Sequence, residues 1–243
     1  MDGTALSSRN NTNDHAYSMR TFVRILEFMS DRTETDGRRA RGDASRSVIL
    51  ERATDLASVD GLDGLTIGRL ATAAGSSKSS IATLFRSKEG LQLATVAAAR
   101  EIFTERIIEP ARAEPRGARR LAALLGNALA YSRDRVFSGG CFFAATAADV
   151  DSKPGPVSDA VRAALAEWYR YLELQVEAAI AGGELRAESA SALAFELVSL
   201  TEHANARSLL FGSVAPYEVA GRALRDRLRT AGADPEALEL LRR

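Results

Sequence analysis

The spacing of apolar positions predicts helices along most of the chain. Between residues 157 and 180, apolar side chains recur every three or four positions, as they do on one face of a helix. The same period predicts helices over residues 46–59, 87–109, 116–135 and 140–150, and Pro110 is expected to end the second of these. No stretch alternates apolar and polar residues in the way of a half-buried strand. We therefore expect an all-α fold.

Residues 66–91 predict two short helices separated by a tight turn. Thr66 precedes apolar positions at helical spacing and can act as a helix N-cap. Gly75 can adopt the left-handed conformation that follows a helix end, and Ser76 or Ser77 can cap a second helix. Two helices joined by such a turn are typical of the helix-turn-helix motif, whose second helix enters the major groove of DNA.

The outward face of this second helix carries cationic and hydroxyl side chains and no carboxylate. Ile81, Leu84 and Phe85 are expected to face inward, whereas the opposite side presents Lys78, Ser79, Ala82 and Thr83, with Ser80 near its edge. Such groups suit an electronegative groove. The helix that begins at Ser87 and Lys88 could bind a phosphate at its N-terminus, and the first helix, with Ser45 as its expected N-cap, places Arg46 near the DNA backbone. On periodicity alone, a solvated helical corner is the alternative.

Four runs of residues also match a known pattern. They are Ile49-Leu50-x-x-Ala53-x-x-Leu56, Gly61-Leu62-x-x-Leu65-Thr66-Ile67, Ala74-Gly75-x-Ser77-Lys78 and Leu84-Phe85-x-Ser87-Lys88-Glu89-x-Leu91. In order and spacing they resemble the N-terminal domain of the TetR family of bacterial transcriptional regulators. The resemblance implies phosphate contacts from Thr66 and Lys88, although Ala82 and Leu84 stand where the family usually has aromatic residues. The predicted DNA-binding residues are Arg46, Thr66, Ser77, Lys78, Ser79, Ser80, Thr83, Ser87 and Lys88.

The resemblance implies three parts of the chain. Residues 1–44 form a disordered or partly helical arm, residues 45–91 the helix-turn-helix DNA-binding domain, and residues 92–243 a helical effector-binding and dimerisation domain. The arm is rich in Ser, Asn, Asp and Thr, a composition typical of disorder. A solvated linker is the favoured interpretation of its basic end, although three arginines there could enter a minor groove. They are Arg38, Arg39 and Arg41.

Two C-terminal helices predict a homodimer. Residues 189–211 are apolar on more than one side, and residues 216–229 carry a row of small and apolar residues at Ala220, Ala223, Leu224 and Leu228. We expect these helices to pair with their copies, so that a twofold dimer matches a near-palindromic operator in double-stranded DNA. Closure of the monomer core is the alternative.

Aromatic and apolar residues on the long helices could line a pocket for a small-molecule effector of unknown identity. The candidates are Phe103, Ile107, Phe142, Phe143, Trp168, Tyr169, Phe195, Glu202 and His203. For any one of them, a place in the ordinary core is the favoured alternative. We expect a repressor whose ligand shifts the helix starting at Ser87. This shift would move the recognition helices out of register with successive grooves of the DNA.

Composition argues against other classes of protein. The chain has one cysteine, Cys141, and two histidines, His15 and His203, too few for a zinc site or a di-iron bundle. Neither a phosphate loop nor a nucleophile elbow is present, so we predict no catalytic residue, metal or cofactor. The net charge is +0, and no apolar run is long enough to span a bilayer, which favours a cytoplasmic protein. A helical adaptor that has lost DNA binding is the alternative function.

Overall fold

The protein is described by a computed structural model that covers residues 37–242, with side chains from Ser45 to Leu241. The chain divides into two units, residues 1–44 and 45–243, and the description of the first is limited to the start of a helix. The arm predicted before residue 37 therefore lies outside the described residues. The second unit contains the rest of that helix and all the later ones.

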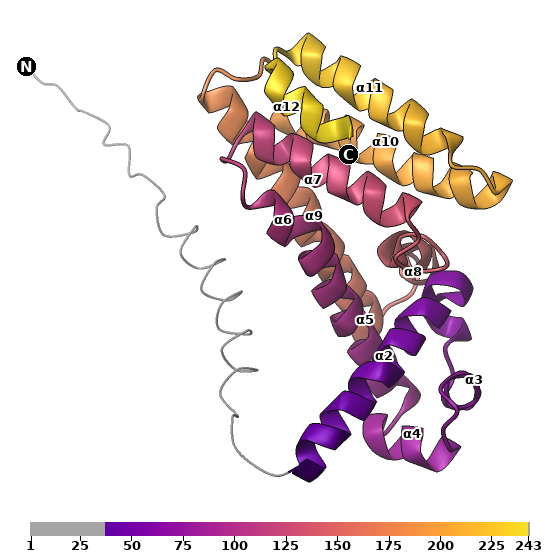
Figure 1. Ribbon diagram of the computed structural model, residues 1–243. Helices are drawn as coiled ribbons and strands as arrows, with labels where there is room; N and C mark the ends of the chain where they lie inside the picture. Colours follow the sequence, from indigo (N-terminus) through magenta and orange to yellow (C-terminus); the bar gives the residue numbers. More distant parts are fainter. Residues whose placement is uncertain (1–36, 243) are drawn as a thin grey trace, which may run out of the picture. The chain divides into compact units, whose positions relative to one another are not determined.

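Helices joined by turns and short loops make up the described residues, which contain no strand beyond one isolated bridge between Phe137 and Gly140, and the all-α prediction is confirmed. The helices are α2 (Gly37–Gly64), α3 (Ile67–Ala73), α4 (Lys78–Phe85), α5 (Lys88–Phe103), η1 (Thr104–Ile108), α6 (Glu109–Ala111), α7 (Ala118–Arg133), α8 (Phe142–Val150), α9 (Pro156–Ala181), α10 (Ala190–Phe211), α11 (Ala215–Ala231), α12 (Pro235–Glu239) and η2 (Leu240–Arg242). Figure 1 shows α2, α3 and α4 grouped together, with the remaining helices forming a larger bundle.

The first helix differs from its predicted bounds at both ends. Ser45 does not cap it, because α2 already begins at Gly37; the arginines and alanines of residues 38–44 have good helix propensity and continue the helix toward the N-terminus. Arg38, Arg39 and Arg41 thus lie in a helical segment, although their side chains are not described. At the other end, Gly61 leaves helical geometry with φ 72° and ψ 172°, as expected for a glycine at a helix end.

The predicted stop at Pro110 is wrong. The chain passes from α5 through the π-helical turn η1 into α6, and Pro110 lies in the first turn of α6. The Glu109 N–H donates to the Thr104 carbonyl five residues back, so the hydrogen-bond register changes just before the proline. A proline is tolerated in the first turn of a helix, where its missing N–H costs no bond. α6 ends at Ala111, one residue after the proline.

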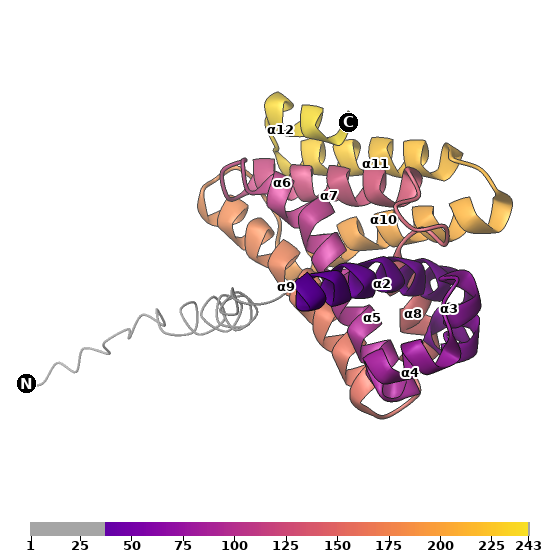
Figure 2. The ribbon, with the colours of Figure 1, turned by 60° about the horizontal axis from the view of Figure 1, so that its bottom comes forward.

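The larger bundle is built around α7. This helix packs against α9, α10 and α11, and the C-terminal elements α12 and η2 also lie on it. The helices α5 and α9 pack side by side, and α10 contacts both α9 and α11 (Figure 2). The large side chains among the fully buried residues come from both groups of helices, including Leu70 and Ile81 in the first and Leu121 and Leu172 in the second.

The row of small residues on α11 faces the interior of the subunit, not a second copy. Ala220, Leu224 and Leu228 are buried, and α11 packs on α10, α7 and α12. The small residues therefore allow close packing within one chain, which corrects the predicted role of this row in pairing. Among the described residues, no helix is both long and apolar enough to cross a membrane.

Candidate DNA interface and effector region

Local capping residues build the turn between α3 and α4 as the sequence predicts. The Thr66 hydroxyl accepts a hydrogen bond from the Arg69 N–H at 3.2 Å, which caps α3. Gly75 has φ +58°, and the Ser77 hydroxyl accepts from the Ser80 N–H at 3.1 Å to cap α4. These bonds satisfy N–H groups at both helix starts and fix the direction in which α4 leaves the turn.

One side of α4 is buried and the other is open. Ile81 and Phe85 lie in the core, while the outward side exposes the predicted DNA-binding residues Ser77, Lys78, Ser79, Ser80 and Thr83. Leu84, which was expected to face inward, is 36 % exposed, because a helix of eight residues buries only one narrow side against α3 and α5. The exposed side of α4 thus offers one ammonium group and several hydroxyls.

Ser87 and Lys88 begin α5 close to the end of α2. The Ser87 hydroxyl accepts from the Gly90 N–H at 2.9 Å, and the Lys88 ammonium donates to the Asp63 carbonyl at 3.0 Å. An ammonium group has three donors, so this contact orients Lys88 without using up its capacity for a phosphate. The Asp63 carboxylate accepts from Lys153 at 2.5 Å, and this contact holds the pKa of Asp63 below its usual value.

Arg46 and Thr66, two of the predicted DNA-binding residues, are both engaged in contacts within the DNA-binding group. The Arg46 guanidinium lies 5.3 Å from the centre of the Phe85 ring, in the geometry of a cation–π contact, so Arg46 braces the end of α4. Its Nε is buried and has no hydrogen-bond partner. Thr66 is half-buried and its hydroxyl is engaged in the α3 cap. Both residues support α3 and α4 more directly than they offer free groups to a ligand.

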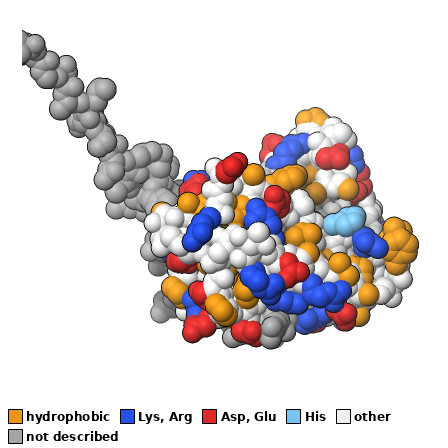
Figure 3. All heavy atoms as spheres, turned by 90° about the horizontal axis from the view of Figure 1, so that it is seen from above, with side chains coloured by type: hydrophobic (Ala, Val, Ile, Leu, Met, Phe, Trp, Pro, Cys, Tyr) orange, Lys and Arg blue, Asp and Glu red, His pale blue; other side chains and the backbone are white. Residues whose placement is uncertain are grey.

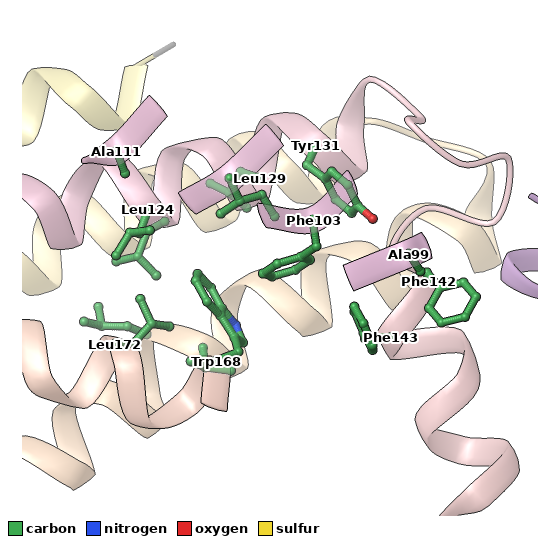
Figure 4. Packing of buried hydrophobic residues seen from close by; sticks show 14 of the residues in the cluster. Ala99, Phe103, Ala111, Leu124, Leu129, Tyr131, Phe142, Phe143, Trp168 and Leu172 are labelled. Atoms are coloured by element: carbon green, nitrogen blue, oxygen red, sulfur yellow. The ribbon is translucent and has the colours of Figure 1, made fainter. Parts of the chain in front are cut away.

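The central aromatic candidates form one packed cluster (Figure 4). The Phe103 ring meets Trp168, Phe143 and Tyr131 edge to face, with ring centres 5.0, 5.7 and 5.7 Å apart. Phe142 packs against Phe143 in the same way at 5.2 Å. All of these rings are buried, as is Ile107. The structure brings Phe103, Ile107, Phe142, Phe143 and Trp168 into the core.

The four other candidates, Tyr169, Phe195, Glu202 and His203, lie at the surface. Phe195 is 75 % exposed on α10, so it does not join the Phe103 cluster; the helical period places it on the opposite side of α10 from Leu193 and Leu197. Glu202 and His203 are also exposed, and Glu202 accepts a hydrogen bond from the Tyr169 hydroxyl at 2.7 Å. Desolvation and this carboxylate raise the pKa of Tyr169. Phe195, Glu202 and His203 thus lie outside the buried aromatic cluster, and their role in ligand binding stays a prediction.

Two buried polar groups, one in the aromatic cluster and one further along α9, are not predicted by the sequence pattern. The Tyr131 hydroxyl and the Gln175 Oε1 are buried without a hydrogen-bond partner. Burial raises the pKa of Tyr131, so its hydroxyl remains a proton donor. A buried polar atom without a partner costs free energy, and such atoms are where a ligand or an ordered water gains most. Both residues fall at ordinary core positions of the helical period, so the sequence does not indicate that their polar atoms lack partners.

An exposed apolar surface lies on α10 and the start of α11. It consists of Phe195, Leu209, Leu210, Phe211, Val214 and Val219, with exposed fractions between 41 % and 76 %. Figure 3 views the molecule from the side of α11 and α12 and shows apolar side chains between groups of charged ones. Large apolar side chains exposed in this number on neighbouring elements are typical of a protein interface.

Two family models match the chain. One, described as bacterial regulatory proteins of the tetR family, matches residues 49–95, and the other, described as the tetracyclin repressor-like C-terminal domain, matches residues 117–224. No curated protein sequence matches the chain.

Several solved structures share the fold. A TetR transcriptional regulator from Chloroflexus aurantiacus J-10-FL is 28% identical, with a TM-score of 0.68 over 76% of this chain and 94% of that one. A TetR-family regulator from Agrobacterium tumefaciens is 23% identical, with a TM-score of 0.69 over 79% and 99%. The regulator AibR, solved with isovaleryl coenzyme A and operator DNA, is 17% identical, with a TM-score of 0.62 over 74% and 96%.

Proposed function

We propose, since this chain belongs to the TetR family of bacterial transcriptional regulators, that it is a homodimeric repressor released from a near-palindromic operator by a small-molecule effector. DNA binding and regulation come with the family. The dimer, the sign of regulation, the effector and the residues that carry them form the proposal.

The exposed side of α4 carries the proposal for DNA. Lys78, Ser79 and Thr83 are exposed on a helix that Ser77 caps, and this side has no carboxylate. Cations and hydroxyls at the start of a recognition helix can donate to phosphates and to acceptor atoms of base edges. Lys88 stands at the start of α5 with donors free beyond its bond to Asp63. We assign Thr83 to base contact and Lys88 to phosphate contact.

The exposed apolar surface on α10 and α11 supports the dimer. Side chains such as Leu210, 76 % exposed, and Phe211, 67 % exposed, gain free energy only if a second surface covers them. A twofold arrangement would bring the same patch of two copies together and would repeat α4 on a second half-site. Residues 189–211 and 216–229 therefore remain our assignment for pairing, through their exposed side.

The aromatic cluster supports an effector site within the bundle. Phe103, Phe143 and Trp168 supply apolar walls, and the unpartnered Tyr131 hydroxyl and Gln175 oxygen supply polar groups for orientation. Phe103 ends α5, whose other end carries Lys88. A ligand that separates Phe103 from Trp168 would displace α5 and with it the DNA-binding helices, provided that it binds this state more tightly.

Selection of random duplex DNA tests the proposal. The wild-type protein should enrich a near-palindrome. Lys88→Ala should weaken binding about equally for all sequences and lower the salt slope by about one per subunit, whereas Thr83→Ala should change the preference at particular bases.

Arg116→Ala, which removes an exposed cation between α6 and α7, away from the assigned DNA-contacting and pairing residues, is the matched control and should change neither property. If no sequence is enriched, the protein-interaction adaptor becomes the better function. If both Lys88→Ala and Thr83→Ala leave affinity and base preference unaltered, our assignment of the DNA-contacting residues is wrong.

A further inference from the structure

The turn between α7 and α8 is attached to the first helix of the DNA-binding group. The Ser138 N–H and hydroxyl both donate to the Asp55 carboxylate, at 2.7 and 3.1 Å. The next N–H, that of Gly139, donates to the buried Ser58 hydroxyl at 3.0 Å. A Cβ at Gly139 would lie 1.9 Å from the Ser58 carbonyl oxygen, so the turn rests directly on the backbone of α2.

The other side of the same turn is attached to α10 and α11. The Cys141 N–H donates to the Asn205 side-chain oxygen at 3.3 Å, and the Tyr217 hydroxyl donates to the same oxygen at 3.2 Å. Arg135 donates to the Ser208 hydroxyl at 3.0 Å. Asn205 and Ser208 are buried on α10, and the residues that follow Ser208 belong to the exposed apolar surface. The turn therefore bridges α2 and the proposed pairing surface directly.

The turn has little freedom to bend. The Gly140 N–H donates to the Phe137 carbonyl at 2.8 Å, and Gly140 has φ +78°. Arg135, at the start of the turn, has φ +53°, a conformation that a non-glycine residue keeps only when its surroundings hold it. A Cβ at Gly140 would lie 2.2 Å from the Asn205 side-chain oxygen, so the close approach requires glycine.

From these contacts we infer that the turn from Arg135 to Cys141 fixes the distance between the two recognition helices and so determines the half-site spacing of the operator. The inference rests on the proposed function. Alone, the covalent link through α5 would let the DNA-binding helices pivot, whereas the attachment at Asp55 and Ser58, together with the Asp63–Lys153 contact at the end of α2, opposes that rotation. One base pair added between half-sites shifts a half-site by about 3.4 Å and turns it by about 35°. DNA-binding helices held by these contacts cannot follow this movement.

The test uses full-length protein and duplexes that share the half-sites selected by the wild type but differ in spacer length by one or two base pairs. For one added base pair, the wild type should lose at least about tenfold in affinity, on the scale of one mismatched pair. Ser58→Ala and Asp55→Ala remove the hydrogen-bond acceptors on α2 and should reduce this loss to about threefold or less. Gly139→Ala, which pushes α2 away from the turn, should move the optimal spacing.

Thr230→Ala is the control, since this exposed hydroxyl bonds only within α11 at the Asp226 carbonyl. Base preference within each half-site and the dimer dissociation constant should stay at wild-type values in the folded variants, which excludes a general loss of structure. Unchanged spacing profiles in folded Ser58→Ala and Gly139→Ala proteins would overturn the inference. Failure of the wild type to select a palindrome would instead overturn the proposed function.

Discussion

Replacement of Phe211 by alanine should separate the two subunits. Phe211 is 67 % exposed at the end of α10. A phenylalanine presents about 200 Å² of surface, so about 130 Å² is available to be covered, which corresponds to about 3 kcal/mol at 25 cal/mol per Å². A twofold dimer contains two copies, and the full effect of about 6 kcal/mol is an upper bound because alanine and local repacking recover part of it. We expect the dimer dissociation constant to rise by about 10² to 10⁴.

Sedimentation across a protein dilution series measures this constant, and circular dichroism checks that the subunit stays folded. Two valines provide a matched comparison: Val219 on α11 is 54 % exposed within the apolar surface, and Val59 on α2 is 61 % exposed outside it. Val219→Ala should weaken the dimer by about tenfold, since each copy loses about 0.8 kcal/mol, whereas Val59→Ala should leave it unchanged.

Affinity for the whole operator should fall in the same order as dimer stability, because only the dimer engages both half-sites at once. Affinity for a single half-site should stay the same. If Phe211→Ala remains dimeric at concentrations where the wild type begins to dissociate, this surface is not the pairing interface. A stronger effect from Val59→Ala than from Val219→Ala would place the interface elsewhere.

Three further predictions concern the interior. Gly126→Ala should lower the free energy of unfolding by about 1 to 3 kcal/mol in thermal denaturation, because its Cβ would lie 2.5 Å from the Leu240 carbonyl oxygen. Tyr131→Phe should change it by less than about 1 kcal/mol in denaturant, since the buried hydroxyl makes only a weak contact with the Phe142 backbone; a larger loss of stability would contradict this. Burial raises the pKa of Cys141 to about 11, so stability should fall as pH rises from about 8.5, the unfolded value, toward 11, where the folded state keeps a proton that the unfolded chain releases. Cys141→Ala should remove that slope, and alkylation at pH 8 should be slower than for a free thiol.

The helix-turn-helix was predictable because its determinants are local. Thr66 and Ser77 bond to N–H groups three residues further on, and Gly75 takes the left-handed conformation within the same turn. Each of these bonds depends on neighbours in the sequence, which are visible as capping residues beside an apolar period. The exposed side of α4 follows from the same period.

Predictions failed where packing or a change of helix type decided the outcome. The π turn η1 shifts the hydrogen-bond register before Pro110, and no residue pattern announced it. The small residues of α11, such as Ala220, fit a subunit interface and an internal contact equally well by sequence. Phe195 shows the converse: an aromatic residue expected in a pocket is 75 % exposed on the outer side of α10. Periodicity identifies an apolar face but not the surface that covers it.

The attachment between the α7–α8 turn and α2 shows why the link between the DNA-binding helices and the pairing surface is the feature hardest to predict from sequence. Asp55 and Ser58 read as ordinary polar positions on the first helix, and their partners lie 83 and 81 residues away. Contacts at that separation leave no local pattern, because the hydrogen-bond acceptors on α2 and the donors of Ser138 and Gly139 meet only after the bundle has formed. Yet these bonds decide how far α4 can move relative to the apolar surface on α10. A DNA-binding surface can thus be inferred from neighbouring residues, whereas its distance from a second copy depends on long-range packing.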